Sequence, residues 1–173
     1  MKSSKLIILT ISILLISVTG CIKEKDYTKW KIDNETYLQN MKDSTTYVKE
    51  NFIYDENINY YYKVLLSGNS DGGSPGMNDY VTVNYQGKLT NGTIFEQTYS
   101  GLSPINNNTA RPVKFKLGEL LYGWIVNLME MKPGEIRTIV IPQQIGYGAD
   151  NLGEIPPYST LIFDIQLISY SSN

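Results

Sequence analysis

The sequence predicts an α+β domain, in which one short helix covers a face of a mostly antiparallel sheet of about five strands. Apolar and polar residues alternate in several short segments between Asn59 and Ser169, as expected of half-buried strands. Glycine, proline and asparagine separate these segments. One further stretch has its apolar residues at the spacing of a helix face: Leu121, Trp124, Ile125 and Leu128. A lone helix among strands buries such a face by packing on the sheet.

The strand candidates are short runs rich in β-branched and aromatic residues. Asn91-Gly92 predicts a hairpin turn within this series. Lys132-Pro133-Gly134 ends the helix, because proline cannot continue it. Longer loops are expected at residues 67–77, 100–112 and 143–159. The expected strands are residues 59–66, 80–89, 93–98, 113–117, 135–141 and 160–169.

The N-terminus has the pattern of a bacterial lipoprotein signal peptide, residues 1–20. Lys2 and Lys5 precede an apolar run from Leu6 to Val18, which is shorter than the ~20 residues of a membrane-spanning helix. The run ends in Val-Thr-Gly-Cys, which resembles a lipobox, so Cys21 is expected to be acylated, with palmitate among the attached chains, and to anchor the chain to a membrane. The alternatives are a cleaved secretory signal with an incidental cysteine, or a buried N-terminal helix.

Residues 21–58 are expected to form a lipid-anchored tether followed by a helix from Asn34 to Asn51. Trp30 falls in the polar tether, and a thin apolar stripe follows it. This helix serves as a spacer between membrane and domain, or alternatively as a dimerisation helix. The remaining residues, 59–173, form the globular domain.

The composition excludes several kinds of chemistry. The chain contains no histidine and a single cysteine, so it has no Ser-His-Asp or Cys-His arrangement and no internal disulfide. No metal site and no cofactor are expected. The net charge of −2 is spread along the chain, without the basic stripe that nucleic-acid binding requires.

A series of short motifs resembles the FKBP-type peptidyl-prolyl isomerases between about residues 60 and 170. The motifs occur in the order of that family: Val81-Thr82-Val83-Asn84-Tyr85-Gln86-Gly87, Phe95-Glu96, Phe115-Lys116-Leu117-Gly118, Gly123-Trp124, Met131-Lys132-Pro133-Gly134-Glu135, Tyr147-Gly148-Ala149, Ile155-Pro156-Pro157 and Leu161-Ile162-Phe163-Asp164. The resemblance implies a twisted antiparallel sheet wrapped around the short helix. It also implies prolyl isomerisation without a cofactor.

The resemblance implies a pocket with Trp124 as its floor. The other residues expected to take part in catalysis are Tyr85, Phe95, Glu96, Tyr147 and Phe163. Substrate-binding positions are Val113, Leu120, Leu121 and Ile155. The family implies that the Leu121 backbone N–H and the Tyr147 hydroxyl bind ligand carbonyls. A tryptophan on an apolar helix face is alternatively a plain core residue.

The chain departs from the family pattern at several places. Glu96 stands where the family usually has aspartate, and Val113 replaces an aromatic residue. The segment before the helix, 118–123, is shorter than in compact members, and the loop 100–112 is longer. These departures bear on substrate preference and on drug affinity.

The expected function is a lipid-anchored prolyl isomerase at the cell envelope, periplasmic or on the outer face, that assists the folding of exported proteins. Its expected partners are Xaa-Pro segments, with macrolide immunosuppressants as further ligands. Two alternatives stay open. One is a binding module of the same fold that acts as a chaperone or assembly factor, and the other is a structural lipoprotein of a surface machine.

Overall fold

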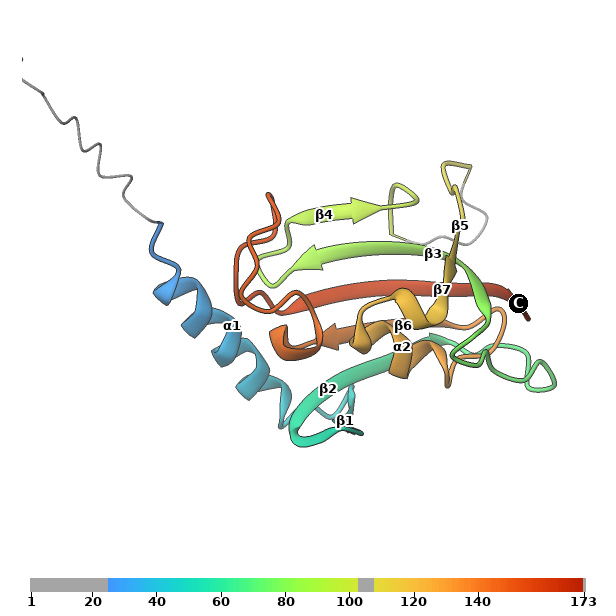
Figure 1. Cartoon of the computed structure of the whole chain (residues 1–173), viewed down its shortest axis with the longest axis horizontal. Coiled ribbons are helices and arrows are strands. Elements are labelled where there is room, and N and C mark those ends of the chain that lie inside the picture. The colour runs from blue at the N-terminus through green and yellow to red at the C-terminus, as the bar shows by residue number, and fades with distance from the viewer. Residues whose placement is uncertain (1–24, 103–107, 173) are drawn as a thin grey trace, which may run out of the picture.

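The computed structural model describes residues 25–102 and 108–172, so the predicted signal peptide and Cys21 lie outside the described residues. Within these ranges the chain forms one antiparallel sheet with two α-helices (Figure 1). The strands are β1 (Val48–Phe52), β2 (Asp55–Leu66), β3 (Tyr80–Leu89), β4 (Ile94–Gln97), β5 (Val113–Lys116), β6 (Ile136–Ile141) and β7 (Leu161–Ser171). The helices are α1 (Thr28–Met41) and α2 (Tyr122–Leu128), with 3-10 turns η1 (Leu117–Glu119) and η2 (Gln143–Ile145).

The strand order places the last strand of the chain in the middle of the sheet. It runs β1-β2-β6-β7-β3-β4, and β5 pairs with the first half of β3. The strands β3 and β7 pair antiparallel along their length, from Tyr80 opposite Ser171 to Leu89 opposite Leu161. All six residues of β6 are buried, which fits its place between β2 and β7. The α+β prediction is confirmed, with seven strands among the described residues.

Helix α2 packs on one face of this sheet, as its apolar stripe predicts. Trp124, Ile125 and Leu128 are buried, in one core cluster with Val83, Ile139 and Leu167. The helix is shorter than the apolar stretch that predicts it, because residues 117–119 form η1 and Leu121 is the N-cap. Two turns are enough to bring one face of the helix onto the strands.

The N-terminal helix lies earlier in the chain than predicted. The sequence indicates a helix from Asn34 to Asn51, whereas α1 spans Thr28–Met41 and Val48–Phe52 is strand β1. The helix prediction was wrong for residues 42–51, because β1 pairs with β2 and this pairing outweighs the weak helix propensity of a threonine- and valine-containing segment. β2 itself begins at Asp55, so residues 48–52 and 55–58, predicted as part of the tether, belong to the sheet.

The second half of α1 packs on the sheet face opposite α2. Tyr37, Leu38 and Met41 contact a cluster formed by Tyr61, Val140 and Ile162. The neighbours of Val140 in β6, Ile139 and Ile141, belong to the cluster under α2, and side chains alternate between the two faces of a strand. The two helices therefore cover opposite faces, which explains why β6 is buried throughout. Within residues 25–102 and 108–172, no helix is long and apolar enough to cross a membrane.

Candidate functional site

A pocket of about 140 Å³ opens between α2, the central strands and the loop that follows β6. Residues from five different parts of the chain line it: Tyr85, Glu96, Phe115, Leu120, Leu121, Trp124, Tyr147 and Phe163. Seven of these eight side chains are aromatic or leucine, and Glu96 alone is charged, so an apolar ligand group is favoured there.

Trp124 lies at the centre of the aromatic residues. Its ring centroid is 5.0 Å from Tyr85, 5.1 Å from Phe163 and 6.3 Å from Phe115, and each pair meets edge to face. Edge-to-face contacts contribute about 0.5–1.5 kcal/mol each beyond area burial, and they fix the orientation of the rings. The indole plane is thereby held by three strands, β3, β5 and β7, while one side borders the pocket.

The indole N–H of Trp124 is unusual among the described residues. It is the one buried side-chain nitrogen or oxygen in them that makes no hydrogen bond. An unpaired donor in the interior costs about 1–3 kcal/mol, and such a group calls for a functional or structural explanation. Trp124 itself lines the pocket.

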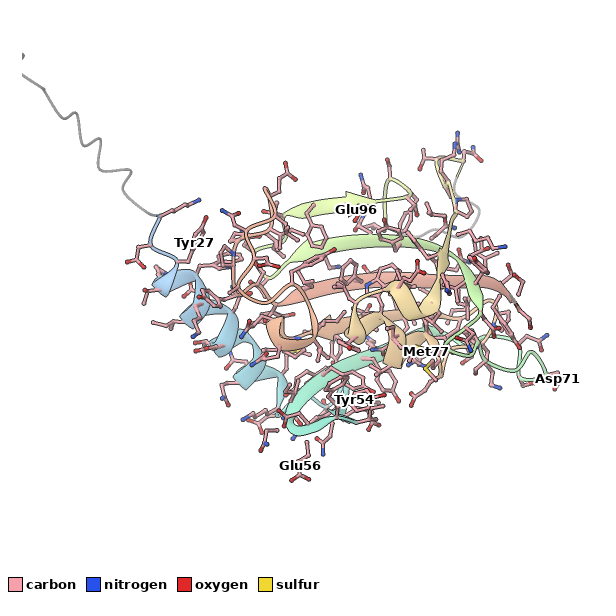
Figure 2. The ribbon with its side chains drawn as sticks, in the orientation of Figure 1. Tyr27, Tyr54, Glu56, Asp71, Met77 and Glu96 are labelled. Carbon is pink, nitrogen blue, oxygen red and sulfur yellow. The ribbon has the colours of Figure 1, made fainter. Side chains whose placement is uncertain are left out.

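Two tyrosine hydroxyls and one carboxylate form the polar part of the site. Burial, with a hydrogen bond to Glu96, raises the pKa of Tyr85 above its ordinary value of 10.0. Burial also raises the pKa of Tyr147, and the charge of Glu96 adds to this shift. Both phenols therefore stay protonated at neutral pH and can donate a hydrogen bond. Glu96 projects from β4, at the edge of the sheet (Figure 2).

Local backbone structure places Leu121 and Tyr147 at the pocket. Leu121 is the N-cap of α2, and its carbonyl accepts from the N–H groups of Trp124 and Ile125 at 2.9 and 3.0 Å. Its own N–H has no backbone acceptor among the described residues. Tyr147 follows η2, and Gly148 has a φ of +62°, a left-handed conformation that glycine adopts without strain. The Gly148 N–H donates to the Gln143 carbonyl at 2.9 Å.

The structure brings seven of the ten predicted pocket residues to the pocket lining, and three lie elsewhere. Phe95 packs behind the lining, edge to face with Phe163 at 5.6 Å. Ile155 is buried in the core. Val113, at the start of β5, is exposed. In its place Phe115, two residues further on the same strand face, reaches the pocket. Val113 and Phe115 are two residues apart, so they lie on the same face of the strand. This spacing was the signal by which the sequence could have identified Phe115.

Comparison with known proteins agrees with this geometry. Residues 72–168 match the sequence model of the FKBP-type peptidyl-prolyl cis-trans isomerase family. The peptidyl-prolyl cis-trans isomerase Mip of Coxiella burnetii is 43% identical over 109 residues, which cover 62% of this chain and 43% of that protein. The FKBP-type isomerase FkpA of Escherichia coli K12 is 31% identical over 136 residues, which cover 79% of this chain and 46% of that protein. The chain thus matches less than half the length of these two relatives.

Two solved structures have the same fold. The crystal structure of FkpA from Escherichia coli superposes with a TM-score of 0.65 at 28% identity, covering 83% of this chain and 62% of that one. A peptidyl-prolyl isomerase from Pseudomonas syringae superposes with a TM-score of 0.67 at 27% identity, covering 86% and 98%. The family match covers more than half of the chain and contains all eight residues that line the pocket. This chain belongs to the FKBP-type peptidyl-prolyl cis-trans isomerase family.

Proposed function

We propose that this protein catalyses the cis-trans isomerisation of Xaa-Pro bonds in exported polypeptides at the cell envelope. The observation that carries the proposal is the pocket itself, in which Trp124, Tyr85, Phe115 and Phe163 surround a space that fits a proline ring. Proline is apolar and lacks an N–H, so an aromatic pocket accepts it without leaving a buried donor unpaired.

The reaction needs no nucleophile and breaks no covalent bond. Its barrier of ~18–20 kcal/mol comes from the loss of amide resonance as the bond twists. The twisted amide is less polar than the planar one, so an apolar pocket stabilises it relative to the ground state. The absence of histidine from the chain is compatible with such chemistry.

The polar groups at the pocket have separate roles in this proposal. The Tyr147 hydroxyl and the Leu121 N–H donate hydrogen bonds to substrate carbonyls on either side of the proline. Glu96 accepts a hydrogen bond from Tyr85 and so orients that ring and hydroxyl. Trp124 supports the proline ring from below. The same aromatic lining makes a macrolide a candidate inhibitor.

A prolyl isomerisation assay on a short Xaa-Pro peptide tests the proposal, with the chain beginning after Cys21. Accelerated isomerisation supports the enzyme. Binding of a proline peptide without acceleration contradicts it and favours the alternative, a binding module that acts as a chaperone or assembly factor.

Tyr147→Phe should lower kcat/KM by about two- to tenfold, because it removes one neutral hydrogen bond worth about 0.5–1.5 kcal/mol and keeps the ring. The melting temperature should change little. Tyr122→Phe is the matched control, because Tyr122 is exposed beside the pocket residue Leu121 and does not line the pocket. An unchanged kcat/KM in Tyr147→Phe would show that this hydroxyl does not contact the substrate.

The membrane anchor is a separate part of the proposal, supported by the lipobox-like sequence that ends at Cys21. Cys21→Ser should move the protein from the membrane fraction to a soluble form, or leave an unprocessed precursor without acyl groups. Stable anchoring requires more than one acyl chain, because a single chain binds only marginally. Intact-mass measurement of the mature wild-type protein checks this, and an unmodified Cys21 would rule out the anchor.

A further inference from the structure

Helix α1 contacts the loop that carries Tyr147, residues 142–160 between β6 and β7 (Figure 1). The indole N–H of Trp30 donates a hydrogen bond of 3.0 Å to the Ser159 hydroxyl. That hydroxyl in turn donates to the Pro156 carbonyl at 2.7 Å. Ser159 is buried. Trp30, expected to lie in a solvated tether, is instead part of the packed structure and bonded to the end of this loop.

Asn34 attaches the same helix to the loop at a second point. Its side chain is 1% exposed. Its Oδ1 accepts from the Thr160 N–H at 2.8 Å and from the Thr90 hydroxyl at 3.3 Å, and its Nδ2 donates to the Trp30 carbonyl at 2.8 Å. A buried amide is costly unless it is bonded. The docking of α1 is therefore fixed in one position along its axis, since a shifted helix would leave this amide and the Thr160 N–H unpaired.

The contacts extend from the end of the loop to the residue beside Tyr147. Tyr158 adopts a left-handed conformation with φ 64°, and its N–H donates to the Gly148 carbonyl at 2.7 Å. The Lys31 ammonium lies 5.0 Å from the centre of the Tyr158 ring. Closer to the tip of the loop, Asn151 donates to the Tyr27 hydroxyl at 3.0 Å. The helix and its N-cap Tyr27 thus contact the tip and the second arm of the loop, and the Tyr158–Gly148 hydrogen bond joins the first arm to the second.

This helix lies outside the part of the chain that matches the family, residues 72–168. The loop is long, and its described secondary structure is one 3-10 turn and one isolated bridge. Loops of this length are flexible unless contacts from elsewhere restrain them. α1 supplies such contacts from residues that the matched domain does not include.

We propose that Trp30 and Asn34 are positioning residues of the isomerase pocket, which hold loop 142–160 so that the Tyr147 side chain stays at the pocket lining. The inference rests on the proposed function, and it gives the N-terminal helix a role beyond spacing. Trp30 acts through Ser159 and Asn34 through Thr160, and the Tyr158–Gly148 hydrogen bond joins this end of the loop to the residue beside Tyr147. Neither Trp30 nor Asn34 lines the pocket. A loosened loop weakens the binding of the ground state and of the transition state equally. Loss of this contact should therefore raise KM and leave kcat unchanged.

The test uses Trp30→Phe and Ser159→Ala in the whole chain. Trp30→Phe keeps an aromatic ring and removes the donor, and Ser159→Ala removes the hydroxyl that it binds. Each should raise KM by about two- to tenfold, with kcat nearly unchanged. Lys29→Ala is the control, because the Lys29 side chain is 87% exposed on the same helix and should leave both constants unchanged.

A double-mutant cycle separates positioning from general stability. If Trp30 acts through Tyr147, the KM effect of Trp30→Phe should largely disappear in a Tyr147→Phe background. Full additivity of the two effects, or an unchanged KM in both single variants of an active enzyme, would overturn the inference. If Trp30→Phe does not fold, the same cycle is made with Ser159→Ala.

Amide hydrogen exchange makes the result independent of the proposed function. The Tyr158 and Thr160 amides should exchange faster in Trp30→Phe and Ser159→Ala than in the wild type, while amides of β3 keep their rates. If the wild-type protein is inactive, the proposed isomerase function is wrong. The exchange rates would still show whether α1 restrains the loop. Unchanged exchange at both amides would overturn the inference.

Discussion

Trp124→Leu should lose both stability and activity, and the loss of activity should exceed what unfolding explains. The indole is 4% exposed and contacts three other aromatic rings. Truncating a buried aromatic residue costs about 3–5 kcal/mol for alanine, and leucine refills part of the space, so about 2–4 kcal/mol of unfolding free energy should be lost. Because the ring also borders the pocket, kcat/KM should fall at least about tenfold, equivalent to 1.4 kcal/mol of transition-state binding.

Ile125→Val is the matched control for this variant. Ile125 is the next residue on α2 and is equally buried, but it does not line the pocket. It should cost about 0.5–1.5 kcal/mol and leave kcat/KM of the folded protein unchanged. The measurements are chemical unfolding curves and isomerisation kinetics on both variants. Normal kcat/KM in folded Trp124→Leu would mean that the indole serves only the core.

Fluorescence gives a direct view of the same ring. The chain has two tryptophans, so Trp30→Phe leaves Trp124 as the sole indole. Its emission should change on titration with a proline peptide or a macrolide. Trp30→Phe loses the hydrogen bond to Ser159, so the titration should reach correspondingly higher ligand concentrations, whereas deleting the segment would also remove the Asn34 contact to the loop.

Gly123→Ala should be the second severe change, because it separates α2 from the sheet. A Cβ at this position would lie 2.4 Å from Cγ2 of Ile141 and 2.7 Å from its Cδ1. Ile141 is fully buried on β6 and cannot move aside without displacing its own neighbours. Overpacking of this kind costs about 1–3 kcal/mol or more. The helix must shift to relieve the contact, and the shift carries Trp124 with it, so kcat/KM should also fall.

Gly76→Ala is the control for the glycine substitution. A Cβ there would have one neighbour, Oδ2 of Asp79, at an ordinary distance of 3.6 Å, and the backbone does not require a left-handed φ. Melting temperature and kcat/KM should match the wild type. Wild-type stability and activity in Gly123→Ala would contradict the close packing of α2 on β6.

The strands and the helix under the pocket were predictable because each has a local signal. The run Tyr80–Leu89 was predicted with the bounds that it has, since alternation of Val81, Val83 and Tyr85 has a period of two. The apolar stripe of α2 likewise follows from helical spacing. Strands β1 and the start of β2 were missed, because their residues are largely exposed and have no clear alternation.

The pocket was predictable in part, through resemblance to a family rather than through pattern. The motif positions predicted that Tyr85, Glu96, Trp124, Tyr147 and Phe163 meet in one pocket, although these residues are up to 78 positions apart in the sequence. Phe95, Ile155 and Val113 were assigned to the same pocket and lie outside its lining. The direction of a side chain depends on strand register and local twist, which a motif does not specify.

By itself, the sequence determined which segments after residue 59 form strands, which stretch forms the pocket helix, and which catalytic chemistries the chain lacks. These properties depend on local periodicity and composition, so they are readable residue by residue. The tertiary structure alone decided that Val48–Phe52 joins the sheet, that Phe115 lines the pocket, and that Trp30 and Asn34 bind the loop of Tyr147. Each of these depends on contacts between residues far apart in the chain, whose free energy outweighs weak local preference.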